Sequence, residues 1–160
     1  MERTLVILKP SALQRRLVGE ILSRFERKGF ILCGMKMMQL DDKILDEHYS
    51  HLTDKPFYPR IKKSMKSAPV VVCCLQGVNA IPVVHAMAGV TNGRSAAPGT
   101  IRGDFSMSVQ ENVIHTSDSA KTAKEEISRF FAPEELFDYN IATLHYLYSD
   151  EEVELKETKE

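Results

Sequence analysis

The chain has 160 residues, of which 43% are hydrophobic, and this size and composition suit one globular domain with a sizeable core. Its formal net charge is -1 at pH 7, so general attraction to nucleic acid or to an anionic membrane is not indicated, and any anion site must be built locally. The first ten residues hold too few apolar side chains for a signal peptide, and no later run approaches the ~18 of a membrane span, which predicts a cytoplasmic location.

The N-terminal third alternates between strand and helix patterns. Residues 3–8 form a β-rich run that stops at a proline and predicts a strand. Apolar residues at helical spacing over 17–29 predict a helix, which the glycine at its end is placed to terminate. Residues 30–40 alternate well enough for a second strand.

The middle of the chain continues this mixture. Two aspartates open a predicted helix over 41–52, and residues 55–67 are expected to form a further short helix. The continuous apolar run over 69–77 predicts a strand that is buried on both faces, followed by a helix over 79–89. Of the three cysteines, the adjacent pair Cys73 and Cys74 is interpreted as core, and no metal or disulfide site is predicted.

A segment rich in Gly, Ser and Ala covers residues 90–111. A loop this long inside a compact domain is usually functional or disordered. Residues 112–115 are a fourth strand candidate, and an amphipathic helix is predicted over 119–131 with nearby hydroxyl and carboxylate residues as caps. Four strands with interspersed helices predict an α+β fold in which helices pack against the sheet.

His115 is the most informative single residue, because it ends the fourth predicted strand just before a helix N-terminus. Backbone N–H groups and the helix dipole at such a position favour a phosphate ligand. An imidazole that is largely neutral near pH 7 also has a lone pair for covalent phosphoryl transfer. Lys9, Arg94 and Arg102 could supply cations, and Glu126 follows within the helix. From position alone, a core or capping histidine and solvent-facing charges are the favoured interpretation of these residues.

Several motifs together resemble the nucleoside diphosphate kinases. They are RTLVILKP, LVGEILSRFERKGF, HYSHLTDKPFYP, TNGRSAAPGTIRGDF and NVIHTSDS, and the last two carry the family's PGTIRGDF and N-x-x-H-x-S-D patterns. The resemblance implies a ferredoxin-like α/β sandwich, with a four-stranded antiparallel sheet covered by helices. It implies one kinase domain over 1–148, and the residues 149–160 are interpreted as an acidic C-terminal tail.

The resemblance also implies the reaction. The terminal phosphoryl group of a nucleoside triphosphate, typically ATP, is transferred to a nucleoside diphosphate by a ping-pong mechanism through a phosphohistidine at His115. Mg2+ is expected to bridge the phosphates, with no dedicated metal cage in the protein. A homo-oligomer is implied, and a hexamer is expected in preference to a tetramer.

Individual roles are carried over from the resemblance. Lys9 and Tyr49 are expected near the transferred phosphoryl group, Arg102 and Thr91 at the phosphate chain, and Asn112 at the sugar. Ser117 and Glu126 are expected to steady the imidazole. Phe57 resembles the aromatic residue on which the base stacks, between apolar positions at Ile61 and Val109, and stacking accepts any base.

Two of the departures from the family pattern concern His85 and Thr116. His85 stands where the family usually has an arginine that contacts a nucleotide phosphate, and it remains a candidate phosphate ligand here. Loss of the fixed charge predicts a cost of about 1–3 kcal/mol, unless Arg94 reaches inward to replace it. The residue after the motif histidine is commonly glycine, and here it is Thr116.

Two other functions stay open on sequence alone. A catalytically weak relative of the same fold, which binds nucleotides or partners, would form little phosphohistidine. A nucleic-acid-binding protein finds support only in the basic stretch YPRIKKSMK, which is interpreted as a solvated helix face. Nucleic acid and membrane partners are therefore not expected.

Overall fold

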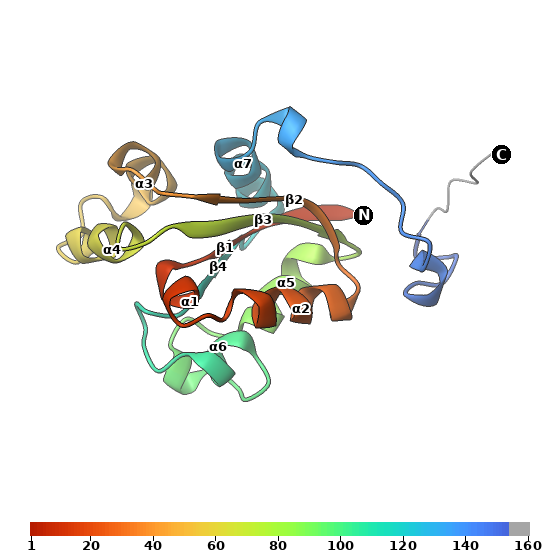
Figure 1. Cartoon of the computed structure of the whole chain (residues 1–160), viewed down its shortest axis with the longest axis horizontal. Coiled ribbons are helices and arrows are strands. Elements are labelled where there is room, and N and C mark those ends of the chain that lie inside the picture. Colours follow the sequence, from red (N-terminus) through yellow and green to blue (C-terminus); the bar gives the residue numbers. More distant parts are fainter. Residues whose placement is uncertain (154–160) are drawn as a thin grey trace.

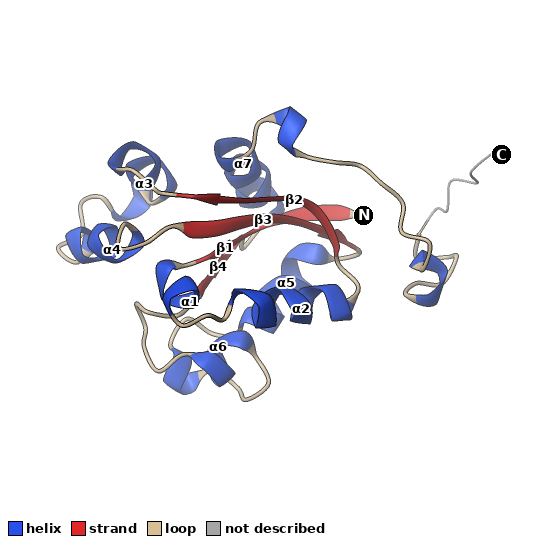
Figure 2. Ribbon diagram, in the orientation of Figure 1, coloured by secondary structure: helices blue, strands red, loops and turns tan. Residues whose placement is uncertain are grey.

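The computed structural model describes residues 1–153. At its centre is a four-stranded sheet in the order β2-β3-β1-β4, in which all neighbouring strands are antiparallel. The strands are β1 (Glu2–Leu8), β2 (Ile31–Met38), β3 (Val70–Gly77) and β4 (Ile114–Thr116). Figures 1 and 2 show the sheet between two sets of helices, which confirms the predicted ferredoxin-like α+β sandwich.

The helices divide between the two faces of the sheet (Figure 1). One face carries α1 (Pro10–Gln14), α2 (Val18–Lys28), α5 (Ala80–Ala88) and α6 (Ile101–Phe105). The other carries α3 (Asp42–His48) and α7 (Ala120–Phe130), with α4 (Tyr58–Met65) beside them. The sheet is therefore covered on both sides, and its central strands are buried.

Strand β3 shows how the sequence produces this arrangement. Val71 and Cys73 pack in the core cluster beneath α2 and α5, whereas Val72 and Cys74 pack in the cluster beneath α3 and α7. Successive side chains of a strand point to opposite faces, so a continuous apolar run is what a doubly covered strand requires. Both cysteines are free and buried, as the sequence predicted.

Two short helices were not predicted from the sequence. Helix α1 starts at Pro10, which occupies the first helical turn, where its missing N–H costs nothing. Helix α6 lies inside the long loop, and its N-cap Thr100 accepts a hydrogen bond from the backbone N–H of Gly103. The expected helix over 41–52 ends at His48, and a 3-10 turn continues over Ser50–Leu52.

Strand β4 is shorter than the predicted strand over 112–115. It begins at Ile114 because the preceding residue, Val113, has a positive φ of 61°. The Ile114 N–H donates to the Asn112 carbonyl at 2.8 Å and closes a tight turn at this point. The turn separates Asn112 from the sheet and directs it toward the end of β1.

After α7 the chain runs to the far end of the sheet (Figure 1). The Tyr148 hydroxyl accepts from the Val78 N–H at 3.2 Å, which fastens this segment to the end of β3. Most of the predicted acidic tail, residues 154–160, lies outside the described residues, so the domain boundary after 148 stays a prediction. Within the described range, no helix has the length and apolarity needed to cross a membrane.

Candidate active site

A cavity of about 620 Å³ opens at the end of β1, beside the antiparallel strand β4. Antiparallel pairing places His115 opposite Ile7, and the Lys9 N–H donates to the Val113 carbonyl at 2.9 Å. The register between the two strands thus brings together residues that are far apart in sequence. The predicted site residues on the cavity wall are Lys9, Tyr49, His85, Thr91, Arg102, Asn112, His115 and Glu126.

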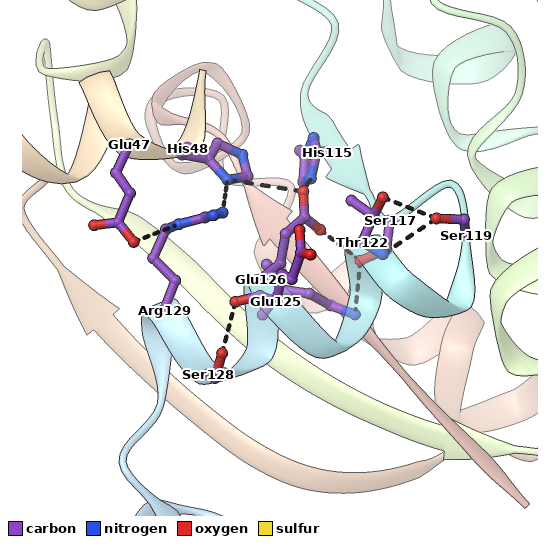
Figure 3. A network of polar contacts seen from close by, with 11 residues as sticks. Glu47, His48, His115, Ser117, Ser119, Thr122, Glu125, Glu126, Ser128 and Arg129 are labelled. Atoms are coloured by element: carbon purple, nitrogen blue, oxygen red, sulfur yellow. Dashed lines mark hydrogen bonds and ion pairs between the residues drawn. The ribbon is translucent and has the colours of Figure 1, made fainter. Parts of the chain in front are cut away.

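His115 is held by a buried carboxylate from α7 (Figure 3). Its Nε2 lies 2.9 Å from Glu126 Oε1, and the Ser117 hydroxyl donates to Glu126 Oε2 at 2.5 Å. Ser117 is fully buried and does not line the cavity, so it contacts the histidine only through Glu126. A carboxylate at Nε2 favours the tautomer that carries its proton there, which leaves the lone pair on Nδ1.

The electrostatics of Glu126 keep it ionised. Burial alone would raise its pKa, but the hydrogen bond and charge of His115, with the Ser117 hydroxyl, outweigh burial and lower the pKa. An anion is therefore fixed beside the imidazole. It is suited to stabilise positive charge that develops on the ring.

Two residues that the sequence analysis missed complete this network. The His48 ring packs edge to face on the His115 ring, with centroids 4.6 Å apart, and Arg129 Nη1 lies 3.3 Å from His48 Nδ1. Burial, and then the neighbouring His115, lower the pKa of His48 to about 3, so His48 stays neutral. Arg129 follows Glu126 by three positions on α7 and so shares its helix face. The three-residue spacing between Glu126 and Arg129 was the sequence signal from which Arg129 could have been identified.

The opposite wall is positively charged. Lys9 Nζ donates to Asn112 Oδ1 at 2.5 Å, and burial, together with the Arg102 charge, lowers the pKa of Lys9 to about 8. Three groups of the Arg102 guanidinium donate to backbone carbonyls just before β4, at the first residue of β4 and after α5. Arg102 therefore fixes the loop and supplies charge to the cavity at once.

Asn112 organises the loop between these groups. It is only 2% exposed, and its amide donates to the carbonyls of Thr91 at 3.2 Å and Val109 at 2.8 Å. Next to it, Val113 has a left-handed conformation that is unfavourable for a β-branched residue. Strain of this kind persists where the surroundings over-determine the backbone, and it is common at functional sites.

A second cavity of about 480 Å³ adjoins the first, since Lys9, Tyr49, Thr91 and Asn112 line both. Its apolar wall contains Phe57, Ile61 and Val109, the three residues expected around a base. Phe57 is 38% exposed at the start of α4, so it is not a core residue.

His85 lines the main cavity, but Arg94 lines neither cavity. The Arg94 side chain is exposed and donates to the Met107 carbonyl at 3.0 Å. The expectation that Arg94 reaches inward to replace the missing arginine is therefore wrong in this structure. In the basic stretch on α4, Lys62 and Lys66 pair with acidic residues of α3, in keeping with a solvated face.

Comparisons with known proteins place this site in a family. The family profile described as nucleoside diphosphate kinase matches residues 2–136. The chain belongs to the nucleoside diphosphate kinase family. The kinase of Parabacteroides distasonis is 60% identical over 152 residues, which are 95% of this chain and 99% of that protein. Nucleoside diphosphate kinase B of Canis lupus familiaris is 48% identical over 147 residues, 92% of this chain and 97% of that protein.

A solved structure gives the same result. A halophilic nucleoside diphosphate kinase from Halobacterium salinarum, in complex with CDP, matches with a TM-score of 0.90 and 38% identity over 92% of this chain and 98% of that chain. The chain is thus a nucleoside diphosphate kinase, a nucleotide-binding transferase that moves a phosphoryl group from a nucleoside triphosphate to a nucleoside diphosphate. It belongs to nucleotide metabolism.

Kinases of this family use a divalent cation, and the site has one cluster of nitrogen and oxygen ligands. Ligand atoms of His48, His115 and Glu126 lie within 4.8 Å of one another. This cluster does not suit a hard dication, because two of its ligands are nitrogens and the Arg129 guanidinium lies 3.3 Å from His48 Nδ1. The exposed Asp118 carboxylate on the cavity wall has the oxygen chemistry that Mg2+ prefers.

Proposed function

We propose that His115 is the nucleophile and that Nδ1 is its reacting atom. The hydrogen bond from Nε2 to Glu126 supports this most directly, because it leaves Nδ1 as the ring nitrogen with a lone pair. Nδ1 attacks the terminal phosphorus, the bond to the bridging oxygen of the nucleoside triphosphate breaks, and the nucleoside diphosphate leaves. A second nucleoside diphosphate then takes the phosphoryl group from Nδ1, so one site serves both half-reactions.

In this mechanism Glu126 and Ser117 act on the imidazole and do not contact the nucleotide. As the N–P bond forms, the ring becomes cationic, and the Glu126 carboxylate at 2.9 Å stabilises that charge. Ser117 occupies the second carboxylate oxygen at 2.5 Å and so fixes the direction of the first. His48 packs against the ring and restricts its rotation.

The cationic wall binds the phosphates. Lys9 and Tyr49 contact the transferred phosphoryl group, and Arg102 and Thr91 contact the phosphate chain, in agreement with their places on the cavity wall. Negative charge spreads over the phosphoryl oxygens in the transition state, and prearranged cations stabilise it without reorganisation. Asn112 uses both N–H groups on backbone carbonyls, so a sugar hydroxyl donates to its Oδ1, which among residues 1–153 accepts only from Lys9.

The base occupies the adjoining cavity and stacks on Phe57. Ile61 and Val109 complete an apolar slot that has no need of a particular base edge. Stacking is sequence-tolerant because every base has a π face. The slot therefore accepts purine and pyrimidine nucleotides.

Mg2+ is the divalent cation in this proposal, carried mainly on the phosphate oxygens of the nucleotide. Asp118, one of the exposed carboxylates on the cavity wall, would hold it from the protein side, directly or through water. When bound, the ion would neutralise phosphate charge and orient the terminal phosphate. We also propose a cytoplasmic homo-oligomer, with a hexamer expected in preference to a tetramer, as the family resemblance implies.

Phosphoenzyme formation tests the nucleophile. The purified protein is mixed with Mg2+ and terminally labelled ATP, quenched, and examined for acid-labile, alkali-stable label. The expected result is stoichiometric label that added GDP removes, and no label on His115→Ala. Loss of label supports the assignment when the variant still binds ADP normally, and equal labelling of His115→Ala would overturn it.

A further inference from the structure

His85 and Thr116, both of which depart from the family pattern, contact each other. His85 Nδ1 lies 3.3 Å from Thr116 Oγ1. His85 is on α5 and Thr116 is the last residue of β4, directly after His115, and both line the main cavity. Since neighbouring side chains of a strand point to opposite faces, His115 faces α7 whereas Thr116 faces α5.

The Thr116 hydroxyl depends on His85 as its hydrogen-bond partner. It is 7% exposed, and among residues 1–153 its side chain has no hydrogen-bond partner besides His85. A buried hydroxyl without a partner is costly, so the pair is favoured to stay formed. His85 is itself exposed at the cavity wall, and without this contact its imidazole would be free to change rotamer.

The contact is compatible with either neutral tautomer, because a hydroxyl both donates and accepts. In the tautomer that suits phosphate binding, the hydroxyl donates to Nδ1 and the proton lies on Nε2. When His85 is protonated, the hydroxyl accepts from Nδ1–H and Nε2 again carries a proton. In both states Nε2–H is a donor, which is what a phosphate oxygen requires.

We propose that Thr116 is a positioning residue that holds His85 as a hydrogen-bond donor to a non-transferred phosphate of the bound nucleotide. This inference rests on the proposed function, since it needs a nucleotide in the main cavity beside Lys9 and Arg102. The contact is made in the ground state and in the transition state alike. Its loss therefore raises KM and leaves kcat nearly unchanged.

A double-mutant cycle separates this role from simple packing. Thr116→Val removes the hydroxyl and keeps the branched shape, and it is expected to raise KM for the nucleoside diphosphate about threefold to tenfold, the usual effect of one lost hydrogen bond. Thr116→Ser keeps the hydroxyl and should restore KM to within about twofold of the parent. In a His85→Ala background, Thr116→Val should have no further effect, because the residue through which Thr116 acts is gone.

A spectroscopic measurement checks the same contact without activity. In the free protein at pH 8, nitrogen NMR of His85 should show the Nε2–H tautomer, and Thr116→Val should give a mixture of tautomers. Equal losses from Thr116→Val in both backgrounds, or an unchanged KM with His85 present, would overturn the proposal. Failure of the proposed function is distinguishable, because the parent protein would then form no phosphohistidine at His115.

Discussion

Replacement of Glu126 by glutamine tests the carboxylate beside the nucleophile. Glutamine keeps the shape of the side chain but has one acceptor oxygen, whereas the Glu126 carboxylate accepts from two donors, His115 Nε2 and the Ser117 hydroxyl. One donor must then face an amide N–H or lose its partner. The substitution also removes the negative charge that stabilises the imidazolium during phosphoryl transfer.

The size of the effect follows from the contacts. A hydrogen bond to a charged group contributes about 1.5–3 kcal/mol, so the rate of phosphoenzyme formation should fall about 10- to 150-fold. The second contact lies in the buried interior at Ser117, and its disruption should lower the free energy of unfolding by about 1–2 kcal/mol. The substitution should lower kcat more than it changes KM, because positive charge on the ring develops only as the N–P bond forms.

Rapid-quench measurement of phosphoenzyme formation gives the rate directly. Glu125→Gln is the matched control, since Glu125 is the preceding residue of α7, lines the same cavity and is exposed. We expect the control to remain within about twofold of the parent, as is usual for an exposed substitution. A parental rate for Glu126→Gln, or an equal loss in Glu125→Gln, would refute the role assigned to Glu126.

Three further predictions concern the rest of the site. The pKa of Lys9 is lowered to about 8, so kcat/KM should fall about tenfold per pH unit above this value. Lys9→Arg should move this decrease to higher pH. A decrease that Lys9→Arg leaves in place would exclude Lys9 as its source. His48, whose pKa burial and His115 lower to about 3, should not titrate in NMR between about pH 5 and 8. Arg129→Met should raise the pKa of His48, because it removes a nearby cation. A parent protein in which His48 titrates near 6.5 would contradict the lowered pKa. Phe57→Ala should weaken GDP and CDP binding to similar extents, about 1–3 kcal/mol by calorimetry, and a loss confined to one base would argue against stacking.

Much of the fold could be predicted from the sequence because β1, β2 and β3 are rich in apolar residues and each lies close to a proline or a glycine. Helices α1 and α6 were missed for a physical reason. Each spans five residues, too few to show a period, and each depends on its terminus, Pro10 in one case and the Thr100 cap in the other. The positive φ of Val113, which shortens β4, has no local sequence signal either.

The site was readable only in part. His115 and Glu126 lie in one short stretch of chain, and the resemblance to the family assigned the role of Glu126 beside the imidazole. His48 was missed because its role arises from packing against His115, which joins two distant segments. An inward-pointing Arg94 was one way to replace the missing arginine, but its guanidinium donates to the nearby Met107 carbonyl, a contact that composition cannot predict. The contact between His85 and Thr116 likewise depends on how α5 packs on β4.

Identification of the phosphorylated nitrogen tests the proposed chemistry at the level of a single atom. The labelled protein is digested in alkali, and the two phosphohistidine isomers are separated by chromatography or distinguished by phosphorus NMR. Because Glu126 occupies Nε2 of His115 at 2.9 Å, phosphate on Nδ1 is predicted. Phosphate on Nε2 would contradict the geometry from which the whole mechanism is derived.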